Sequence, residues 1–83
     1  MEFCLITFRS VTPAQRGEGA LRRNGFSCTL QRTPKWMEEQ GCGYSLRIPL
    51  EHAEPAITLL KKQRIAYRKV YLLQEGQTKE LPL

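Results

Sequence analysis

The order of strand-like and helix-like segments is the feature that most constrains how this chain can fold. Residues 3–8 are rich in β-branched and aromatic side chains, which is typical of a buried strand. A helical pattern follows, which Ser10 or Thr12 can cap and which Gly25 can end. The remaining segments are two alternating strands, a second helix and a last strand, at residues 26–31, 44–48, 51–63 and 66–73.

This order, β-α-β-β-α-β, predicts an α+β domain of the ferredoxin-like split type. Right-handed crossovers would place both helices on one face of a four-stranded antiparallel sheet and leave the opposite face open. We expect residues 1–73 to form this single domain. We expect residues 74–83, which are polar, to form a frayed C-terminal tail.

The same periodicity predicts which side chains face the core. On the first helix, Glu18 falls among the side chains predicted to face the core. We interpret it as a carboxylate that lies at the rim or forms an ion pair. Gly17 and Gly19 lower the intrinsic stability of that helix. The side chains predicted to point inward are Val11, Ala14, Glu18, Leu21, Phe26, Cys28, Leu30, Tyr44, Leu46, Ile48, Ala53, Ile57 and Leu60.

Composition predicts a cytoplasmic protein that does not enter a membrane. The 83 residues are 41% hydrophobic, which is ordinary for a globular protein. No apolar run approaches the ~20 residues of a membrane span, and the first residues lack the basic and small-residue segments of a signal peptide. The net charge of +5 is spread over short basic groups, a pattern more typical of a solvated surface than of a nucleic-acid interface.

The chain has three cysteines, Cys4, Cys28 and Cys42, and no CxxC pair. With His52 as the single histidine, a four-ligand zinc site cannot be built at normal spacings, so we expect no metal and no cofactor. Cys4 and Cys28 lie inside predicted strands, where a cysteine usually packs as a small hydrophobe. Nothing in the sequence brings His52 to Cys42, which disfavours a Cys–His catalytic pair.

Cys42 stands between Gly41 and Gly43, just ahead of the strand at residues 44–48. Glycine on both sides leaves the sulfur without a neighbouring Cβ, which suits a thiol that must meet another molecule. Arg32 and Lys35 lie upstream and could favour its thiolate form. From residue types alone, the alternative that the glycines only make a turn and the cysteine fills a gap is equally open.

Several short motifs resemble the selenium/sulfur carrier-like family, a small family otherwise of unknown function. The resemblance covers about residues 3 to 73, and its most specific part is a proline-basic pair followed several residues later by Cys-Gly. Family members usually have Pro-Arg and a serine-rich approach to the cysteine; here the pair is Pro34-Lys35 and the approach is residues 36–40. The motifs that carry it are Leu5-Ile6-Thr7-Phe8-x-Ser10, Glu18-x-x-Leu21, Thr33-Pro34-Lys35, Gly41-Cys42-Gly43, Leu60 and Ile65-x-Tyr67.

The resemblance implies that Cys42 holds a sulfur or selenium atom as a persulfide or selenosulfide and passes it to an acceptor. The implied partners are a donor protein and an acceptor protein, and the chain would be a carrier rather than a stand-alone enzyme. One thiolate is enough for such a carrier. A second cysteine nearby would resolve the adduct prematurely as a disulfide.

Two other classes of function stay open at this stage. The open sheet face could support a homodimer, which would make the chain a regulatory or scaffold domain with an incidental cysteine. The basic groups permit a nucleic-acid-binding module, but the strands lack the aromatic signature with which RRM domains stack bases. A native mass measurement and a salt-sensitive RNA-binding assay separate these classes from the carrier.

Overall fold

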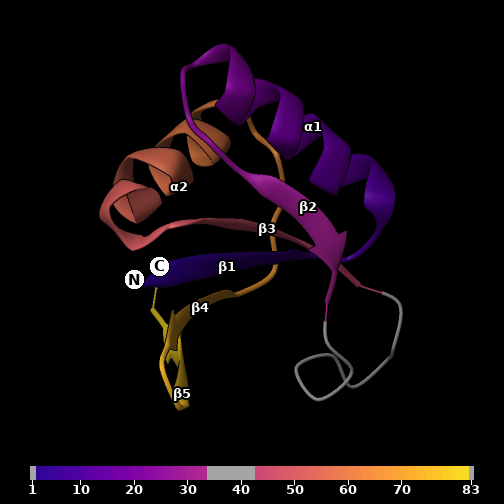
Figure 1. The fold of residues 1–83 in the computed structure, drawn as a ribbon. Helices are drawn as coiled ribbons and strands as arrows, with labels where there is room; N and C mark the ends of the chain where they lie inside the picture. Colours follow the sequence, from indigo (N-terminus) through magenta and orange to yellow (C-terminus); the bar gives the residue numbers. More distant parts are fainter. Residues whose placement is uncertain (1, 34–42, 83) are drawn as a thin grey trace.

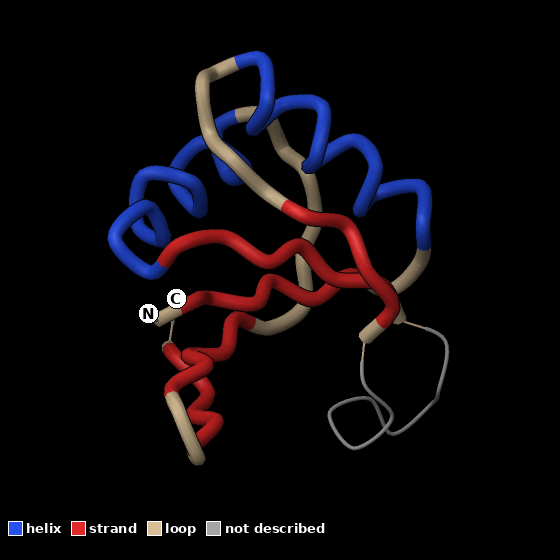
Figure 2. Tube along the Cα trace, in the orientation of Figure 1, coloured by secondary structure: helices blue, strands red, loops and turns tan. Residues whose placement is uncertain are grey.

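The computed structural model describes residues 2–33 and 43–82 of the chain. Within these residues, two α-helices and a five-stranded sheet form an α+β fold, which confirms the predicted class (Figures 1 and 2). Among the described residues, neither helix has the length and apolar character needed to cross a membrane. In chain order the elements are β1 Phe3–Phe8, α1 Val11–Arg23, β2 Thr29–Arg32, β3 Tyr44–Pro49, the 3₁₀ turn η2 Leu50–His52, α2 Ala53–Lys62, β4 Val70–Gln74 and β5 Gln77–Leu81.

The strands lie in the order β2-β3-β1-β4-β5, and every neighbouring pair is antiparallel. Both helices lie on the same side of this sheet (Figure 1). The expected four-stranded ferredoxin-like sheet is wrong in its strand count, because a fifth strand pairs with β4.

The fifth strand lies where the sequence predicts a frayed tail. A two-residue turn with Gly76 at φ 75° connects β4 to β5 and sets Gln74 opposite Gln77. Glycine adopts this positive φ without steric penalty. The strand is missed because its residues are almost all exposed, so no apolar alternation marks it. Whether residues 1–73 fold as an independent domain stays a prediction.

The other elements are close to their expected places, with shifted ends. β2 begins three residues later than expected and β4 four residues later. Helix α1 ends as expected at Gly25, which has φ 84°. There the Phe26 amide donates to the Leu21 carbonyl at 2.9 Å and the Gly25 amide to the Arg22 carbonyl at 3.1 Å, the paired bonds of a Schellman motif.

The core lies between the helices and the sheet, and it contains the helix-facing apolar side chains of β1 and β3 and the buried side chains of both helices. Gly17 faces this core, because a Cβ there would lie 3.1 Å from Phe8 Cζ and 3.2 Å from Leu46 Cδ1. The glycine therefore allows α1 to approach the sheet closely, a role that helix propensity alone does not suggest. Glu18 lies at the rim and pairs with Arg22 at 3.4 Å, as expected.

Candidate functional site

The expected site divides between described and undescribed residues. Gly41, Cys42 and Lys35 lie outside the described residues, so the structure does not test their roles. Arg32 and Gly43 are described, and they lie at the same end of the sheet. Arg32 is opposite Tyr44 in the β2–β3 register, and Gly43 directly precedes Tyr44.

One backbone bond fixes the geometry of this end. The Thr33 amide donates to the Gly43 carbonyl at 3.0 Å, so the β2–β3 pairing extends one position beyond the assigned strands. The Arg32 guanidinium lies 5.7 Å from the centroid of the Tyr44 ring, within the range of a cation–π contact. The structure therefore brings Arg32 and Gly43 close together on neighbouring strands.

Two buried hydroxyl groups lie at the same end, and our sequence reasoning missed them as functional candidates. The Thr33 side chain is 8% exposed and that of Ser45 is 0% exposed. Neither Oγ atom has a hydrogen-bond partner within the described structure. Such groups are rare because a buried hydroxyl without a partner loses its bonds to water. Strand alternation could have placed Ser45 opposite the helices, but no sequence signal shows whether a hydroxyl is bonded.

Thr7 on β1 provides a contrast in the same row of side chains. It pairs with Ser45 across the sheet and is 4% exposed. Its Oγ1 accepts a hydrogen bond from the Lys69 amide at 3.0 Å and donates one to the Lys69 carbonyl at 3.2 Å. Thus one buried hydroxyl of the row is fully bonded, whereas that of Ser45 has no partner among the described residues.

The end of the sheet that carries Gly43 is basic. Arg9 follows β1, Arg32 ends β2, and the Arg68 amide donates to the Thr7 carbonyl at 2.7 Å. Lys69 pairs with Glu80 at 3.7 Å, a half-exposed contact that neutralises little of this charge.

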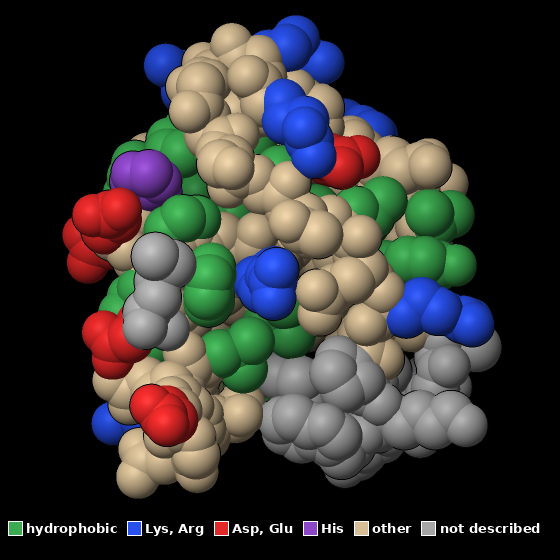
Figure 3. Space-filling model, viewed as in Figure 1, with side chains coloured by type: hydrophobic (Ala, Val, Ile, Leu, Met, Phe, Trp, Pro, Cys, Tyr) green, Lys and Arg blue, Asp and Glu red, His purple; other side chains and the backbone are tan. Residues whose placement is uncertain are grey.

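The opposite end of the sheet is acidic. The Leu50 amide donates to the Glu2 carbonyl at 3.1 Å, which places Glu2 beside Glu51 at the far end of β3. Figure 3 shows most of the acidic side chains of the visible face on the side of the molecule where the chain ends lie in Figure 1. Several carboxylates therefore gather at this end of the sheet, and several basic residues at the Gly43 end.

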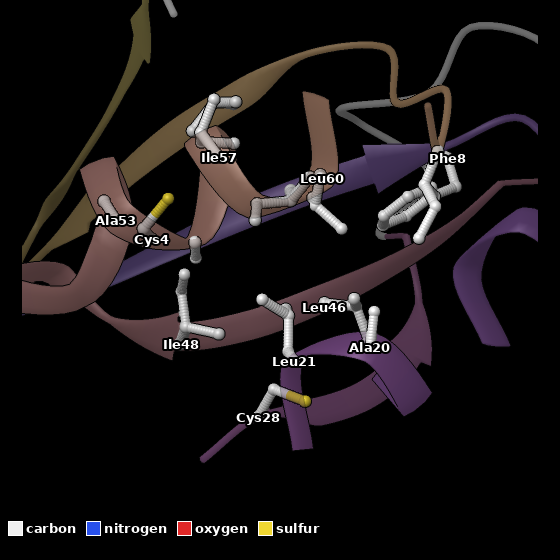
Figure 4. Packing of buried hydrophobic residues seen from close by; sticks show 14 of the residues in the cluster. Cys4, Phe8, Ala20, Leu21, Cys28, Leu46, Ile48, Ala53, Ile57 and Leu60 are labelled. Carbon is white, nitrogen blue, oxygen red and sulfur yellow. The ribbon is translucent and has the colours of Figure 1, made fainter. Parts of the chain in front are cut away.

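Cys4 and Cys28 lie in the core and form no disulfide (Figure 4). Burial raises the pKa of the Cys4 thiol to about 11. Burial also raises the pKa of Cys28, although the nearby Arg22 guanidinium acts in the opposite direction. Both thiols are therefore protonated at neutral pH and covered by apolar side chains, as expected for packing cysteines.

His52 is far from Gly43, because the two residues lie beyond opposite ends of β3. Six residues of strand separate these ends by roughly 17 Å. The His52 ring packs edge-on against Phe26 with 5.9 Å between the ring centroids. This placement gives no support to a Cys–His pair.

No described group of three or more His, Cys, Asp or Glu side chains could hold a metal ion. A groove of about 370 Å³ lies between the start of α2 and the end of β5, at the acidic end of the molecule. Its lining offers two carboxylates and no nucleophile among Leu50, Glu51, Ala53, Glu54, Pro55, Leu81 and Pro82. The Gly43 end of the sheet is therefore the better candidate for thiol chemistry.

A comparison with protein-family models matched residues 3–72 to the family described as "Putative Se/S carrier protein-like". Searches of curated proteins and of solved structures found no match.

Proposed function

The chain belongs to the selenium/sulfur carrier-like family, and on this premise we propose that it carries one sulfur or selenium atom on Cys42. The observation that carries the proposal is the burial of the other two thiols. Cys4 and Cys28 are at most 6% exposed, and burial raises the pKa of both. Cys42, flanked by two glycines within the matched segment, is the remaining thiol of the chain.

The proposed transfer is an exchange that needs no oxidant. The Cys42 thiolate attacks the outer sulfur of a donor persulfide, and a new S–S bond forms as the donor S–S bond breaks. The donor leaves as a thiolate and takes up a proton, while the transferred sulfur keeps its oxidation state. An acceptor thiolate then attacks the outer atom on Cys42 in the same way. Selenium follows the same steps with selenium as the outer atom.

The supporting residues act on the charge and access of this thiol. Gly41 and Gly43 keep its surroundings free of side chains. Lys35 and Arg32 favour the thiolate form, since a nearby cation stabilises the charged state. Arg32 already contacts the Tyr44 ring, so we expect the contribution of Lys35 to be the larger one.

The basic residues near Gly43 bear on the kind of protein that would deliver or accept the atom. A basic surface at the Gly43 end suits a donor or acceptor whose own thiol lies in an acidic surface, because complementary charge speeds encounter. This attraction weakens as salt is added. A cytoplasmic location and the absence of a stand-alone enzymatic activity are part of the same proposal.

Intact mass spectrometry tests the carrier directly. The protein is incubated with a cysteine desulfurase and either cysteine or selenocysteine, and then weighed. We expect a gain of about 32 Da for sulfur or about 79 Da for selenium, which a reductant removes. Cys42→Ser should abolish the gain, whereas the matched control Cys28→Ala should keep it. Equal loading of wild type and Cys42→Ser would overturn the proposal.

A further inference from the structure

Apolar side chains lie together on the face of the sheet opposite the helices. Phe3 and Leu5 of β1 belong to this face, because the alternate residues of the strand face the helices. Across the β1–β4 ladder, Phe3 is opposite Leu73 and Leu5 is opposite Tyr71. Leu5 is buried, whereas Phe3, Tyr71 and Leu73 are only partly buried. We call these four neighbouring side chains the apolar patch.

Two opposite charges flank the patch in one row across the sheet. Arg47 of β3 is opposite Leu5, and Glu80 of β5 is opposite Tyr71. Residues directly opposite each other in a ladder point to the same side, so both charges lie on the face of the patch. In agreement, the Arg47 guanidinium lies 4.9 Å from the centroid of the Phe3 ring. Three strand spacings, or about 14 Å, separate the two charges.

These two charges have weak partners within one copy of the chain. Glu80 lies 3.7 Å from Lys69, but both side chains are more than half exposed, and such a pair contributes little. No carboxylate of the described residues forms an ion pair with Arg47. Its contact with the Phe3 ring leaves its positive charge without a counter-ion. Each copy therefore presents a row that starts with a cation and ends with an anion.

This row is complementary to itself. A two-fold axis parallel to the strands and midway between β1 and β4 lays β1 of one copy over β4 of the other, and β3 over β5. Arg47 then meets Glu80 of the second copy, and Phe3 meets its Leu73. An axis across the strands would instead set Arg47 against Arg47, which like charge disfavours. The register therefore selects one of the two symmetric arrangements.

We propose that two copies of this chain associate face to face through the apolar patch, with Arg47 of each copy paired with Glu80 of the other. Packed sheets lie about 10 Å apart with their strands nearly aligned, a gap that these long side chains span. Association covers the partly exposed side chains of the patch and gives both charges a close partner of opposite sign. Cys42 takes no part in this contact, so the dimer and the proposed carrier are tested separately.

The test exchanges the two charges. Arg47→Glu and Glu80→Arg each create like-charged pairs at both symmetric positions, and the double variant restores opposite charges in reversed order. Arg16→Glu is the matched control, because it changes the net charge as much as Arg47→Glu does, at an exposed position of α1. Sedimentation velocity from micromolar to millimolar concentration gives the dissociation constant of each dimer. Circular dichroism checks that each variant is folded.

We expect wild type to reach the mass of two chains within this range of concentration. Each single variant should raise the dissociation constant about a hundredfold, since two attractive contacts become repulsive. The double variant should return to within about threefold of wild type, because the opposite charges meet again. Arg16→Glu should dimerise like wild type.

Several results would overturn the dimer. A wild type that stays monomeric at millimolar concentration shows that a second copy does not cover this face. A dimer that Arg47→Glu leaves intact uses another surface. If Arg16→Glu weakens the dimer as much as Arg47→Glu, net charge and not this face governs association. Loss in both single variants without recovery in the double variant contradicts the pairing of Arg47 with Glu80.

Discussion

The two faces of the sheet are built from alternate residues of the same strands, yet they differ in chemistry. On the face under the helices, β1 presents Cys4, Ile6 and Phe8, all fully buried among apolar neighbours. On the other face it presents Leu5 and Thr7, which are also buried. On this face the neighbouring strands also present hydroxyl groups. In the part of the chain that the structure describes, the Ser45 hydroxyl has no hydrogen-bond partner.

The two faces contribute differently to the stability of the fold. The helix-covered face supplies the apolar burial that drives folding, and it has the tight packing of a protein interior. The opposite face also carries buried hydroxyls, on Thr7 and Ser45, which add less to stability than buried apolar groups do. The comparison therefore predicts large penalties for changes on the first face and small ones on the second.

Phe8→Ala should have the largest effect, because Phe8 is the largest fully buried side chain among the described residues. Removing a fully buried aromatic ring should lower the free energy of unfolding by about 3–5 kcal/mol. Chemical denaturation followed by circular dichroism measures this loss. A loss below about 1 kcal/mol would contradict the assignment of this face as the core.

Gly17→Val should come next, with a loss of about 1–3 kcal/mol from overpacking. The new side chain would start 3.1 Å from Phe8 Cζ and 3.2 Å from Leu46 Cδ1. Gly19→Val is the matched control, since its Cβ would meet only the mobile end of Arg23, and its stability should equal wild type or slightly exceed it. If both variants lose the same stability, α1 does not pack closely through Gly17.

The pKa of the Cys4 thiol tests how well the helix-covered face excludes water. Burial raises the pKa of Cys4 from 9.0 to about 11, so the folded state holds its proton more tightly than the unfolded state does. This contribution is complete below pH 9 and is lost as the pH rises towards 11, at about 1.4 kcal/mol per pH unit. Denaturation of wild type and Cys4→Ala across this range measures the difference in slope. Parallel curves would show that Cys4 ionises freely.

Thr7→Val should have the smallest effect of the four variants, and it tests the face opposite the helices. It removes two hydrogen bonds to the Lys69 backbone while keeping the shape of the side chain. The expected loss is about 1–2 kcal/mol, measured as a shift in the denaturation midpoint. If the variant is as stable as wild type, the two hydrogen bonds of the Thr7 hydroxyl do not contribute to stability.

Much of the fold could be predicted from the sequence, because strand alternation and helix end signals are local. Gly25 ends α1 as expected, and Leu46 and Ile48 face the core. β5 could not be predicted, since all its residues except Leu81 are polar and exposed and no apolar alternation marks the strand. The end of α2 shows a similar limit: Arg64 adopts φ 58° in the place where glycine is usual.

The candidate site could be predicted only in part. The two glycines around Cys42 draw attention to the thiol, and the register brings Arg32 to the same end of the sheet. The hydroxyls of Thr33 and Ser45 escaped notice because hydrogen bonding depends on contacts between distant residues. Nothing in the identity of a threonine or serine distinguishes the bonded Thr7 from Ser45, whose hydroxyl has no partner among the described residues.

The bond between the Thr33 amide and the Gly43 carbonyl has a consequence for how this chain can change over time. It closes the β2–β3 ladder on itself, so the residues between these two positions form a closed loop in the sense of polymer physics. The entropy of closing a loop grows only with the logarithm of its length, and doubling the length adds only about 0.6 kcal/mol. A change in the number of residues between positions 33 and 43 therefore adds little to the entropic cost of forming the β2–β3 ladder.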